Sequence, residues 1–246
     1  MIRRLAICVV LALLAGMPAL SAELFYMDHD AFTGKYIRPT GPLVISGGIA
    51  RGDYERLLSK IAEDENRFLS QNKIIVASTA GDVSEALKIA KLIKALHSEV
   101  SVGPLTGKCV GACFLIYAAA DQRATDGEQL IGISGLDHAD PTGGTPLLAS
   151  AVRKFLRENE VPDYLAEALF QHAPGNVYWL SDQDEANLKF RAPSFSRYLA
   201  ANCAWDDELE RAAAMGKRSF ADLQPMWACR TRITQADARK ALAAAR

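Results

Sequence analysis

The chain has 246 residues, half of them hydrophobic, and its 28 basic and 29 acidic side chains leave a formal net charge of −1. This composition suits a globular protein with a substantial hydrophobic core. Because the two signs of charge are interspersed, there is no electrostatic reason to expect a nucleic acid or an anionic membrane as a partner.

Residues 1–22 have the pattern of a secretory signal. Arg3 and Arg4 form a positive start, and residues 5–15 form a short hydrophobic stretch. That stretch is shorter than the roughly 20 residues that a membrane span needs, and no other segment is longer and as apolar. We therefore predict a protein that is exported to the periplasm or secreted, with no stable membrane span once the signal is cleaved before Glu23. The alternative is an uncleaved anchor.

Four cysteines follow the predicted signal, and an even number in an oxidising compartment favours disulfides. We predict Cys109–Cys113, which are local, and Cys203–Cys229, which share a C-terminal region with little else to stabilise it. The second pair closes a loop of about 26 residues, which contributes roughly 3 kcal/mol. The alternative, a zinc site, lacks the usual spacing of cysteine and histidine ligands, so we expect no metal and no cofactor.

Strands alternate with helices over the first half of the chain. Strands are expected at residues 42–45, 73–77, 99–102 and 129–134, and the run at 73–77 is continuous and β-branched, as in a strand buried on both faces. Asp53 and Asp82 are expected to cap two of the helices, with Glu85 completing a capping box. A further apolar helix is expected from Ala112. The alternation predicts an α/β fold of stacked βαβ units with a largely parallel sheet.

The second half is expected to be mainly helical. After a loop rich in Gly and Pro at 137–146, the predicted elements are helices at 147–159 and 163–171, a short strand at 178–180 and a helical turn at 183–188. Residues 23–192 are assigned to one domain. Residues 193–246, rich in alanine and charge, are assigned to a small helical C-terminal extension, in which Thr234 would cap a last helix with frayed final turns.

Three segments in this order resemble the superfamily of Clp protease proteolytic subunits and crotonases. They are Leu43–Ile49 with Gly52 and Asp53, then Ile74–Val83, and then Cys109–Cys113 followed by Gln122, Arg123 and residues 131–133. The resemblance extends to about Phe190 and is strongest for secreted bacterial members with two cysteines. It implies a crotonase-like core, and members commonly form rings or trimers through the helical half. We therefore expect a homo-oligomer, with contacts in residues 147–171.

The resemblance also implies a chemistry. In the protease members, backbone N–H groups stabilise an oxyanion, a serine at a helix start attacks the substrate, a histidine acts as base and an aspartate orients it. In this chain the three reacting positions are Gly111, Ser134 and Asn176, so none of the triad residues is retained. The two oxyanion-hole donors would be the backbone amides of Gly81 and Ala112.

Other residues could carry the chemistry instead. His138, beside Asp137 and Asp140, would be a relocated base or a metal ligand, although such residues are ordinary in a turn-rich loop. Either cysteine of the local pair would be a nucleophile if it were reduced. Ser134 would also be one, but has no visible base. The remaining histidines, His29, His97 and His172, are expected to be structural or solvated. The tryptophans, Trp179, Trp205 and Trp227, are expected to be buried anchors, with the lining of a binding groove as the alternative.

These substitutions favour an exported, catalytically inactive Clp protease-like protein that binds a peptide or protein partner in a groove lined by free amides. The alternative is a periplasmic peptidase or hydrolase of the same fold, of serine type or otherwise unusual. Crotonases use the same two amides to stabilise the enolate of a thioester. An exported protein does not meet coenzyme A thioesters, so we do not expect that reaction.

Overall fold

The structure is a computed structural model. Its described residues are 21–27, 41–103, 107–135, 145–173 and 176–246. The predicted signal therefore lies almost wholly outside the described residues. So does most of the predicted loop at 137–146.

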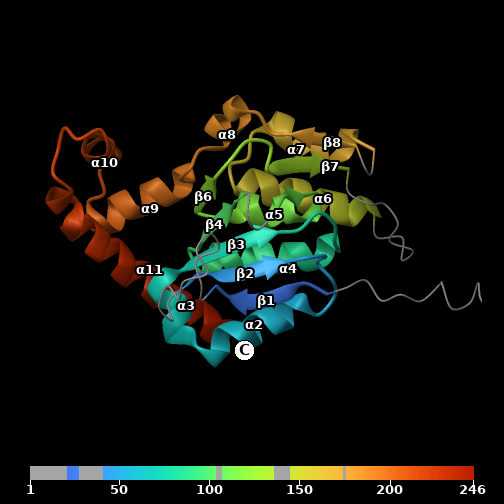
Figure 1. Cartoon of the computed structure of the whole chain (residues 1–246), viewed down its shortest axis with the longest axis horizontal. Coiled ribbons are helices and arrows are strands. Elements are labelled where there is room, and N and C mark those ends of the chain that lie inside the picture. Colours follow the sequence, from blue (N-terminus) through green and yellow to red (C-terminus); the bar gives the residue numbers. More distant parts are fainter. Residues whose placement is uncertain (1–20, 28–40, 104–106, 136–144, 174–175) are drawn as a thin grey trace, which may run out of the picture.

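The main sheet has five strands in the order β1-β2-β3-β4-β6 (Figure 1). Their bounds are Glu23–Tyr26 for β1, Leu43–Ser46 for β2, Lys73–Ala77 for β3, Glu99–Val102 for β4 and Gln122–Thr125 for β6. The last four strands in this order are parallel, and β1 adds to the edge of β2 in the antiparallel sense. This arrangement confirms the predicted α/β fold with a largely parallel sheet.

A second, smaller sheet has the order β5-β7-β8, with bounds Cys109–Val110, Ile131–Ser134 and Val177–Trp179. Two isolated parallel bridges, Ser78 with Cys109 and Ile49 with Gly81, continue its pairing toward the start of the chain. Along the chain, a strand of the main sheet is therefore followed by a short segment that pairs in the smaller sheet, and then by a helix. This unit repeats along the chain, as the prediction of stacked units requires.

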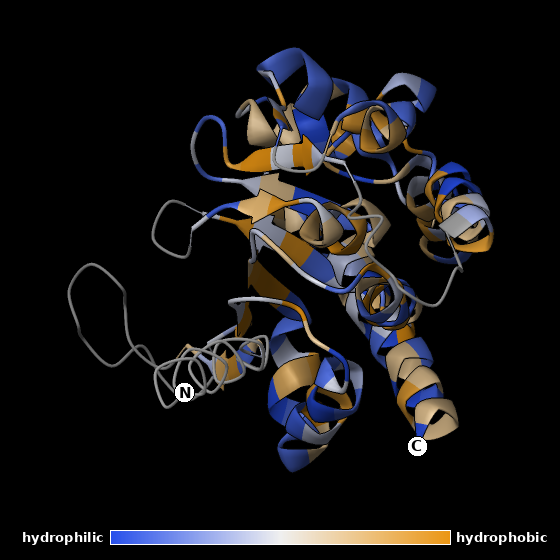
Figure 2. Ribbon diagram, turned by 90° about the vertical axis from the view of Figure 1, so that its right-hand side faces the viewer, coloured by the Kyte–Doolittle hydropathy of each residue, from blue (hydrophilic) through white to orange (hydrophobic). Residues whose placement is uncertain are grey.

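Within the described residues, seven helices precede the C-terminal region: α2 (Asp53–Glu63), α3 (Glu65–Gln71), α4 (Val83–Ala95), α5 (Ala112–Ala119), α6 (Thr145–Glu158), α7 (Asp163–Gln171) and α8 (Asp182–Leu188). Every residue of α5 is buried, as expected of a helix that is apolar on all sides. Figure 2 shows hydrophobic residues gathered in the strands at the centre and hydrophilic residues on the outer helices. No helix in the described part of the chain is long and apolar enough to cross a membrane.

The capping of α4 differs in part from the prediction. The Asp82 carboxylate accepts a hydrogen bond from the Glu85 amide at 2.9 Å, as an N-cap should. The Glu85 side chain does not accept a hydrogen bond from the Asp82 amide, as a capping box would require. Its buried carboxylate instead accepts from the amides of Gly52 and Tyr54, at 3.0 and 2.8 Å. It therefore supplies the acceptor that the start of α2 needs, and ties the two helices together.

The prediction that Asp53 is an N-cap is wrong. Gly52 occupies the cap position, in the left-handed conformation, and Asp53 is the first helical residue. The Asp53 side chain is fully buried and accepts hydrogen bonds from the amides of Ala22 and Ala50, while Arg56 pairs with it at 2.7 Å. Tertiary contacts thus use a residue that the local pattern assigned to the helix end.

The C-terminal region contains α9 (Pro193–Cys203), α10 (Asp207–Ala214), the short 3₁₀ helix η1 (Phe220–Leu223) and α11 (Gln224–Ala245). It has a hydrophobic cluster of its own, formed by Ala192, Phe195, Leu199, Trp205, Ala213, Leu223 and Met226. The predicted disulfide Cys203–Cys229 is present, with a Cα–Cα distance of 5.6 Å, and joins α9 to α11.

The last helix begins ten residues earlier than expected. Thr234 lies in the middle of α11, where its hydroxyl donates to the Arg230 carbonyl at 2.9 Å, so the prediction that it caps the helix is wrong. Its final turns do not fray, because Ala238 and Leu242 are buried in the main core. Arg246 also pairs with Glu65 of α3 at 2.8 Å.

Arg123, on β6, joins three helices through their C-terminal carbonyl groups. One terminal nitrogen donates to the Leu188 carbonyl at 2.6 Å and the other to the Ala118 carbonyl at 2.7 Å. Longer contacts reach the carbonyls of Lys189 and Asn159. Burial lowers the pKa of Arg123, and the charge is balanced by the negative ends of the helix dipoles.

We predict that Arg123→Met lowers the free energy of unfolding by about 3 kcal/mol or more, because several buried carbonyls lose their donor at once. Arg239→Met is the matched control, since Arg239 is exposed on α11. Urea denaturation of both variants measures the difference. Similar midpoints for the two variants would contradict the role given to Arg123.

Candidate functional site

The turn after β3 presents one of the two predicted donor amides. Gly81 pairs with Ile49 through flanking bonds: the Ile49 amide donates to the Ala80 carbonyl and the Asp82 amide to the Ile49 carbonyl. A Cβ atom at Gly81 would lie 2.6 Å from the Ile49 Cβ, so only glycine fits. The Gly81 amide itself donates to no backbone carbonyl of the described residues. It is free to bind a ligand.

The second donor lies at the junction of β5 and α5. Gly111 has φ 63° and ψ −117°, a conformation that favours glycine, and its amide donates to the Gly132 carbonyl at 3.2 Å. Ala112 begins the helix, so its amide has no partner within it. A sharp strand-to-helix turn of this kind is what holds the nucleophile of many hydrolases above its sheet.

The predicted disulfide Cys109–Cys113 spans this junction, with a Cα–Cα distance of 5.2 Å. Both cysteines are fully buried. Because the four cysteines beyond Cys8 form two disulfides, neither member of the local pair is a thiolate nucleophile and the zinc alternative is wrong. The bond fixes the start of α5 to β5.

The structure brings two of the three substituted triad positions together. A Cβ atom built on Gly111 would lie 2.8 Å from the Ser134 hydroxyl oxygen, so position 111 faces Ser134 directly. Ser134 ends β7 and pairs with Val177 of β8. Asn176 immediately precedes Val177 and is exposed, with its amide bonded to the Ala173 carbonyl. All three positions therefore lie at one end of the smaller sheet.

Of the other candidate residues, His172 and Trp179 lie next to the smaller sheet near Ser134, and several others lie outside the described residues. His138, Asp137 and Asp140 belong to the second group. The described residues contain no group of three or more side chains that could hold a metal ion. His172 stacks on the ring of Tyr178 at 5.8 Å, and His97 contacts Asp121 at 2.6 Å.

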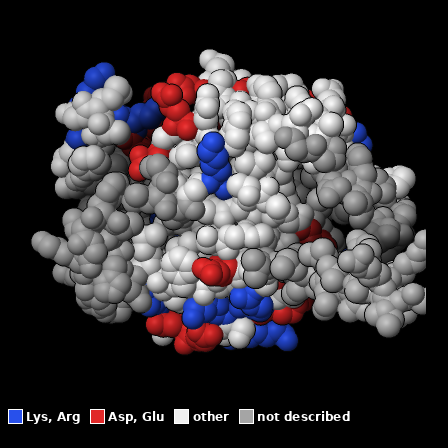
Figure 3. All heavy atoms as spheres, turned by 45° about the vertical axis from the view of Figure 1, so that its right-hand side comes forward, with Lys and Arg blue, Asp and Glu red and all other residues white. Residues whose placement is uncertain are grey.

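Two residues beside the junction have a contact that the sequence did not predict. The Lys108 ammonium lies 4.2 Å from the centre of the Trp179 ring, which makes a cation–π pair at the entrance to β5. Lys108 is exposed and Trp179 half-buried. Figure 3 shows one face of the molecule; its middle is mainly uncharged and its lower edge carries both signs of charge.

Asp184 holds the adjoining strand β8 in place. Its carboxylate accepts from the hydroxyls of Tyr164 and Tyr178 and from the amide and hydroxyl of Ser181. Burial alone would raise the pKa of Asp184, but the bonds from Ser181 and then from the two tyrosines outweigh it and lower the pKa. The pattern Ser-x-x-Asp at the start of α8 is the only sequence signal for this cluster.

Comparisons with known proteins give distant structural matches only. No family model and no curated protein matches the chain. Among solved structures, ClpP1 from Listeria monocytogenes superposes with a TM-score of 0.45 at 16% identity, covering 61% of this chain and 88% of its own. A mutant of the 1510-N membrane-bound stomatin-specific protease gives 0.41 at 15% identity, covering 66% and 83%.

A third structure covers more of the chain. A Bordetella parapertussis protein described as an enoyl-CoA hydratase/isomerase superposes with a TM-score of 0.35 at 12% identity, covering 90% of this chain and 93% of its own. With TM-scores below 0.5, these likenesses say nothing about function. A functional proposal for this chain therefore rests on the geometry of its own residues.

We predict that Gly111→Ser lowers the free energy of unfolding by about 1–2 kcal/mol, from the cost of a positive φ, plus a further loss from crowding against Ser134. Gly216→Ser is the control, because Gly216 has φ 70° and nothing within 4 Å of its Cβ position. Thermal and urea unfolding measure both. An equal or larger loss at Gly216 would contradict the contact with Ser134.

The lowered pKa of Asp184 predicts that the stability of the fold decreases at acid pH. A carboxyl with a lowered pKa stabilises the fold above its unfolded pKa of about 3.9, and that stabilisation is lost as the pH falls through the folded value. We expect the unfolding free energy of Asp184→Asn to be lower at pH 7 and to fall less steeply below about pH 4. Asp182→Asn, exposed on the same helix, should follow the wild type. Parallel curves for all three proteins would contradict this.

Proposed function

We propose that this chain is an exported, non-catalytic relative of the Clp protease subunits that binds an extended peptide or a segment of a partner protein. The proposal rests on the backbone conformation at Gly111. It has the sharp turn that positions a nucleophile, yet the residue is glycine, and the missing side chain would point at Ser134.

The binding groups proposed are the free amides of Gly81 and Ala112. Both lie where a strand turns toward a helix, and Ala112 is at the positive end of the α5 dipole. Such donors suit the carbonyl oxygen of an extended peptide or a carboxylate. Trp179 would supply an apolar contact at the rim, and Lys108 a positive charge.

The lack of a base supports a role in binding rather than catalysis. Neither described histidine is hydrogen-bonded to Ser134: His97 contacts Asp121, and His172, although it lies beside Gly135, stacks on Tyr178. The Ser134 hydroxyl has no hydrogen bond to a described histidine or carboxylate that could activate it. Removing one member of a triad leaves only a residual effect of about 10³–10⁴-fold, and here three positions are substituted.

The proposed export rests on residues 1–22 and on the cysteines. Two disulfides are usual in oxidising compartments and rare in the cytosol. The proposal also includes self-association through α6 and α7, on which Leu147 and Tyr164 are 81% and 48% exposed. Light scattering coupled to size exclusion distinguishes a monomer from an assembly.

The binding experiment measures fluorescence anisotropy of the purified protein with a set of labelled unstructured peptides. Lys108→Ala should weaken peptide binding about two- to fivefold, because it removes one exposed positive charge at the rim of the site. Lys91→Ala, an exposed lysine on α4, should have no effect. Ala112→Pro removes one donor amide at a helix position that proline favours, so it should weaken binding further while the fold is retained.

The activity experiment uses casein, short peptides, ester substrates and a fluorophosphonate probe. We expect no turnover and no labelling by the wild type. Gly111→Ser should gain neither, because position 134 offers no base. Turnover by the wild type that disappears in Ser134→Ala or His138→Ala would show that the chain is a hydrolase of the same fold. Equal peptide affinity in all the binding variants would reject the site.

A further inference from the structure

A small polar cavity lies beneath α11, at the opposite end of the main sheet from the proposed peptide site. It has a volume of about 60 Å³ and is lined by the first residues of β4 and β6, Glu99 and Gln122, by the end of α3, and by Arg230 of α11. A water molecule needs about 10–15 Å³ measured in this way, so the cavity has room for several waters or one small ion.

Arg230 is the feature of this cavity that needs an explanation. Burial lowers the pKa of its guanidinium, and the nearby Arg191 lowers it further. The carboxylates that act against this are those of Glu210 and Glu99. Each is already paired with another cation, Glu210 with Arg191 at 2.8 Å and Glu99 with Lys73 at 2.8 Å. Arg230 forms no ion pair with a described residue.

The aromatic neighbour of Arg230 is shared as well. The Arg191 guanidinium lies 4.7 Å from the centre of the Trp205 ring and that of Arg230 lies 5.9 Å from it. The closer cation therefore takes the better position, and Arg191 is also neutralised by Asp207. A largely buried guanidinium with neither a counter-ion nor a close ring is costly, and a bound anion would offset that cost.

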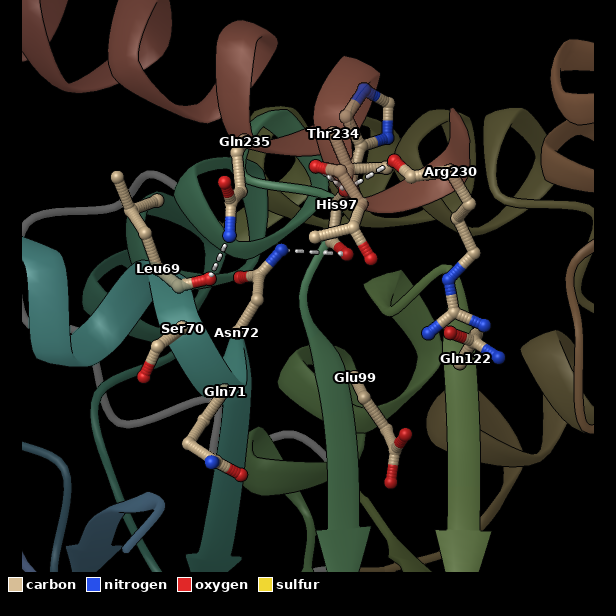
Figure 4. A pocket seen from close by; sticks show the side chains of 11 residues that line it. Leu69, Ser70, Gln71, Asn72, His97, Glu99, Gln122, Arg230, Thr234 and Gln235 are labelled. Carbon is tan, nitrogen blue, oxygen red and sulfur yellow. Dashed lines mark hydrogen bonds between the residues drawn. The ribbon is translucent and has the colours of Figure 1, made fainter. Parts of the chain in front are cut away.

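A second donor faces the same space. Figure 4 shows the guanidinium of Arg230 beside the side chain of Gln122, at one end of the cavity. Gln122 is 5% exposed, yet its side-chain amide has no hydrogen bond with a described residue. At the other end, the donors of Asn72 and Gln235 are already engaged by the carbonyls of His97 and Leu69. The free donors are therefore concentrated beside Arg230.

We propose that Arg230 and Gln122 form a binding site for a small carboxylate, separate from the peptide site. A planar guanidinium can hold both oxygens of a carboxylate, and the Gln122 amide can supply a third hydrogen bond. Glu99 lines the same cavity. Its negative charge disfavours a dianion such as phosphate and leaves a monoanion as the ligand that fits.

The test titrates sodium acetate into the whole purified protein, with sodium chloride at equal ionic strength as the reference. Acetate should raise the wild-type Tm by about 2–4 °C, because it binds only the folded state. Most of the rise should be lost in Arg230→Gln, and the rise should be reduced in Gln122→Leu. It should be unchanged in Arg239→Gln, an exposed arginine on the same helix.

A local measurement accompanies the thermal one. In ¹⁵N NMR spectra, acetate should shift the side-chain amide signals of Gln122 more than those of Gln183, which lies on α8 away from the cavity. No shift at Gln122, or an equal Tm rise in Arg230→Gln, would overturn the proposal. A larger effect of inorganic phosphate than of acetate would overturn the choice of a carboxylate. Lys108→Ala should leave the acetate effect intact, which separates this site from the peptide site.

Discussion

The arrangement of this protein depends on one buried positive charge. Arg123 stands on the last strand of the main sheet, and its guanidinium receives no carboxylate from the described residues; it is surrounded instead by the carbonyl ends of α5, α6 and α8. Each of these helices ends at the same point. Because α5 is fixed there by its end, its first residue is fixed about one helix length away, where the junction at Gly111 lies.

The same anchor determines where the smaller sheet lies. β8 leads into α8, whose end is held by Arg123, and Asp184 near the start of α8 holds β8 through Tyr178. β7 pairs with β8 and carries Ser134 against Gly111. The disulfide between Cys109 and Cys113 then locks the remaining side of the junction. The proposed peptide site is thus rigid, which suits donors that must be in place before a ligand arrives.

Much of this could be predicted from the sequence, and the reasons for the failures are physical. The continuous β-branched run indicated β3, because a strand buried on both faces is apolar throughout, and β2 and β4 were found from shorter hydrophobic segments. β6 could not be found in this way: its Gln122 and Arg123 are polar and buried, and Arg123 is tolerable there only through its distant partners. β1 was missed since it is an edge strand with an alternating, half-exposed pattern.

The helix ends and the candidate site were likewise only partly predictable from the sequence. The local patterns at Asp53 and Thr234 are those of helix caps, but tertiary contacts with Ala22 and the burial of Thr234 override them. The order of motifs was enough to predict the junction, and the number and positions of the cysteines were enough to predict both disulfides. It could not place Gly111 against Ser134, or Lys108 over Trp179, because those contacts exist only when β5, β7 and β8 pair.

The path of α11 has a consequence for how the chain folds during synthesis. This helix begins in the C-terminal cluster and ends against α3, where Gln235 donates to the Leu69 carbonyl across 166 residues of sequence and Arg246 reaches Glu65 across 181. Until those residues leave the ribosome, the apolar surface that Ala238 and Leu242 cover stays open. The core made first is therefore closed only once α11 has been synthesised, so the nascent chain stays incompletely folded until these distant segments can meet.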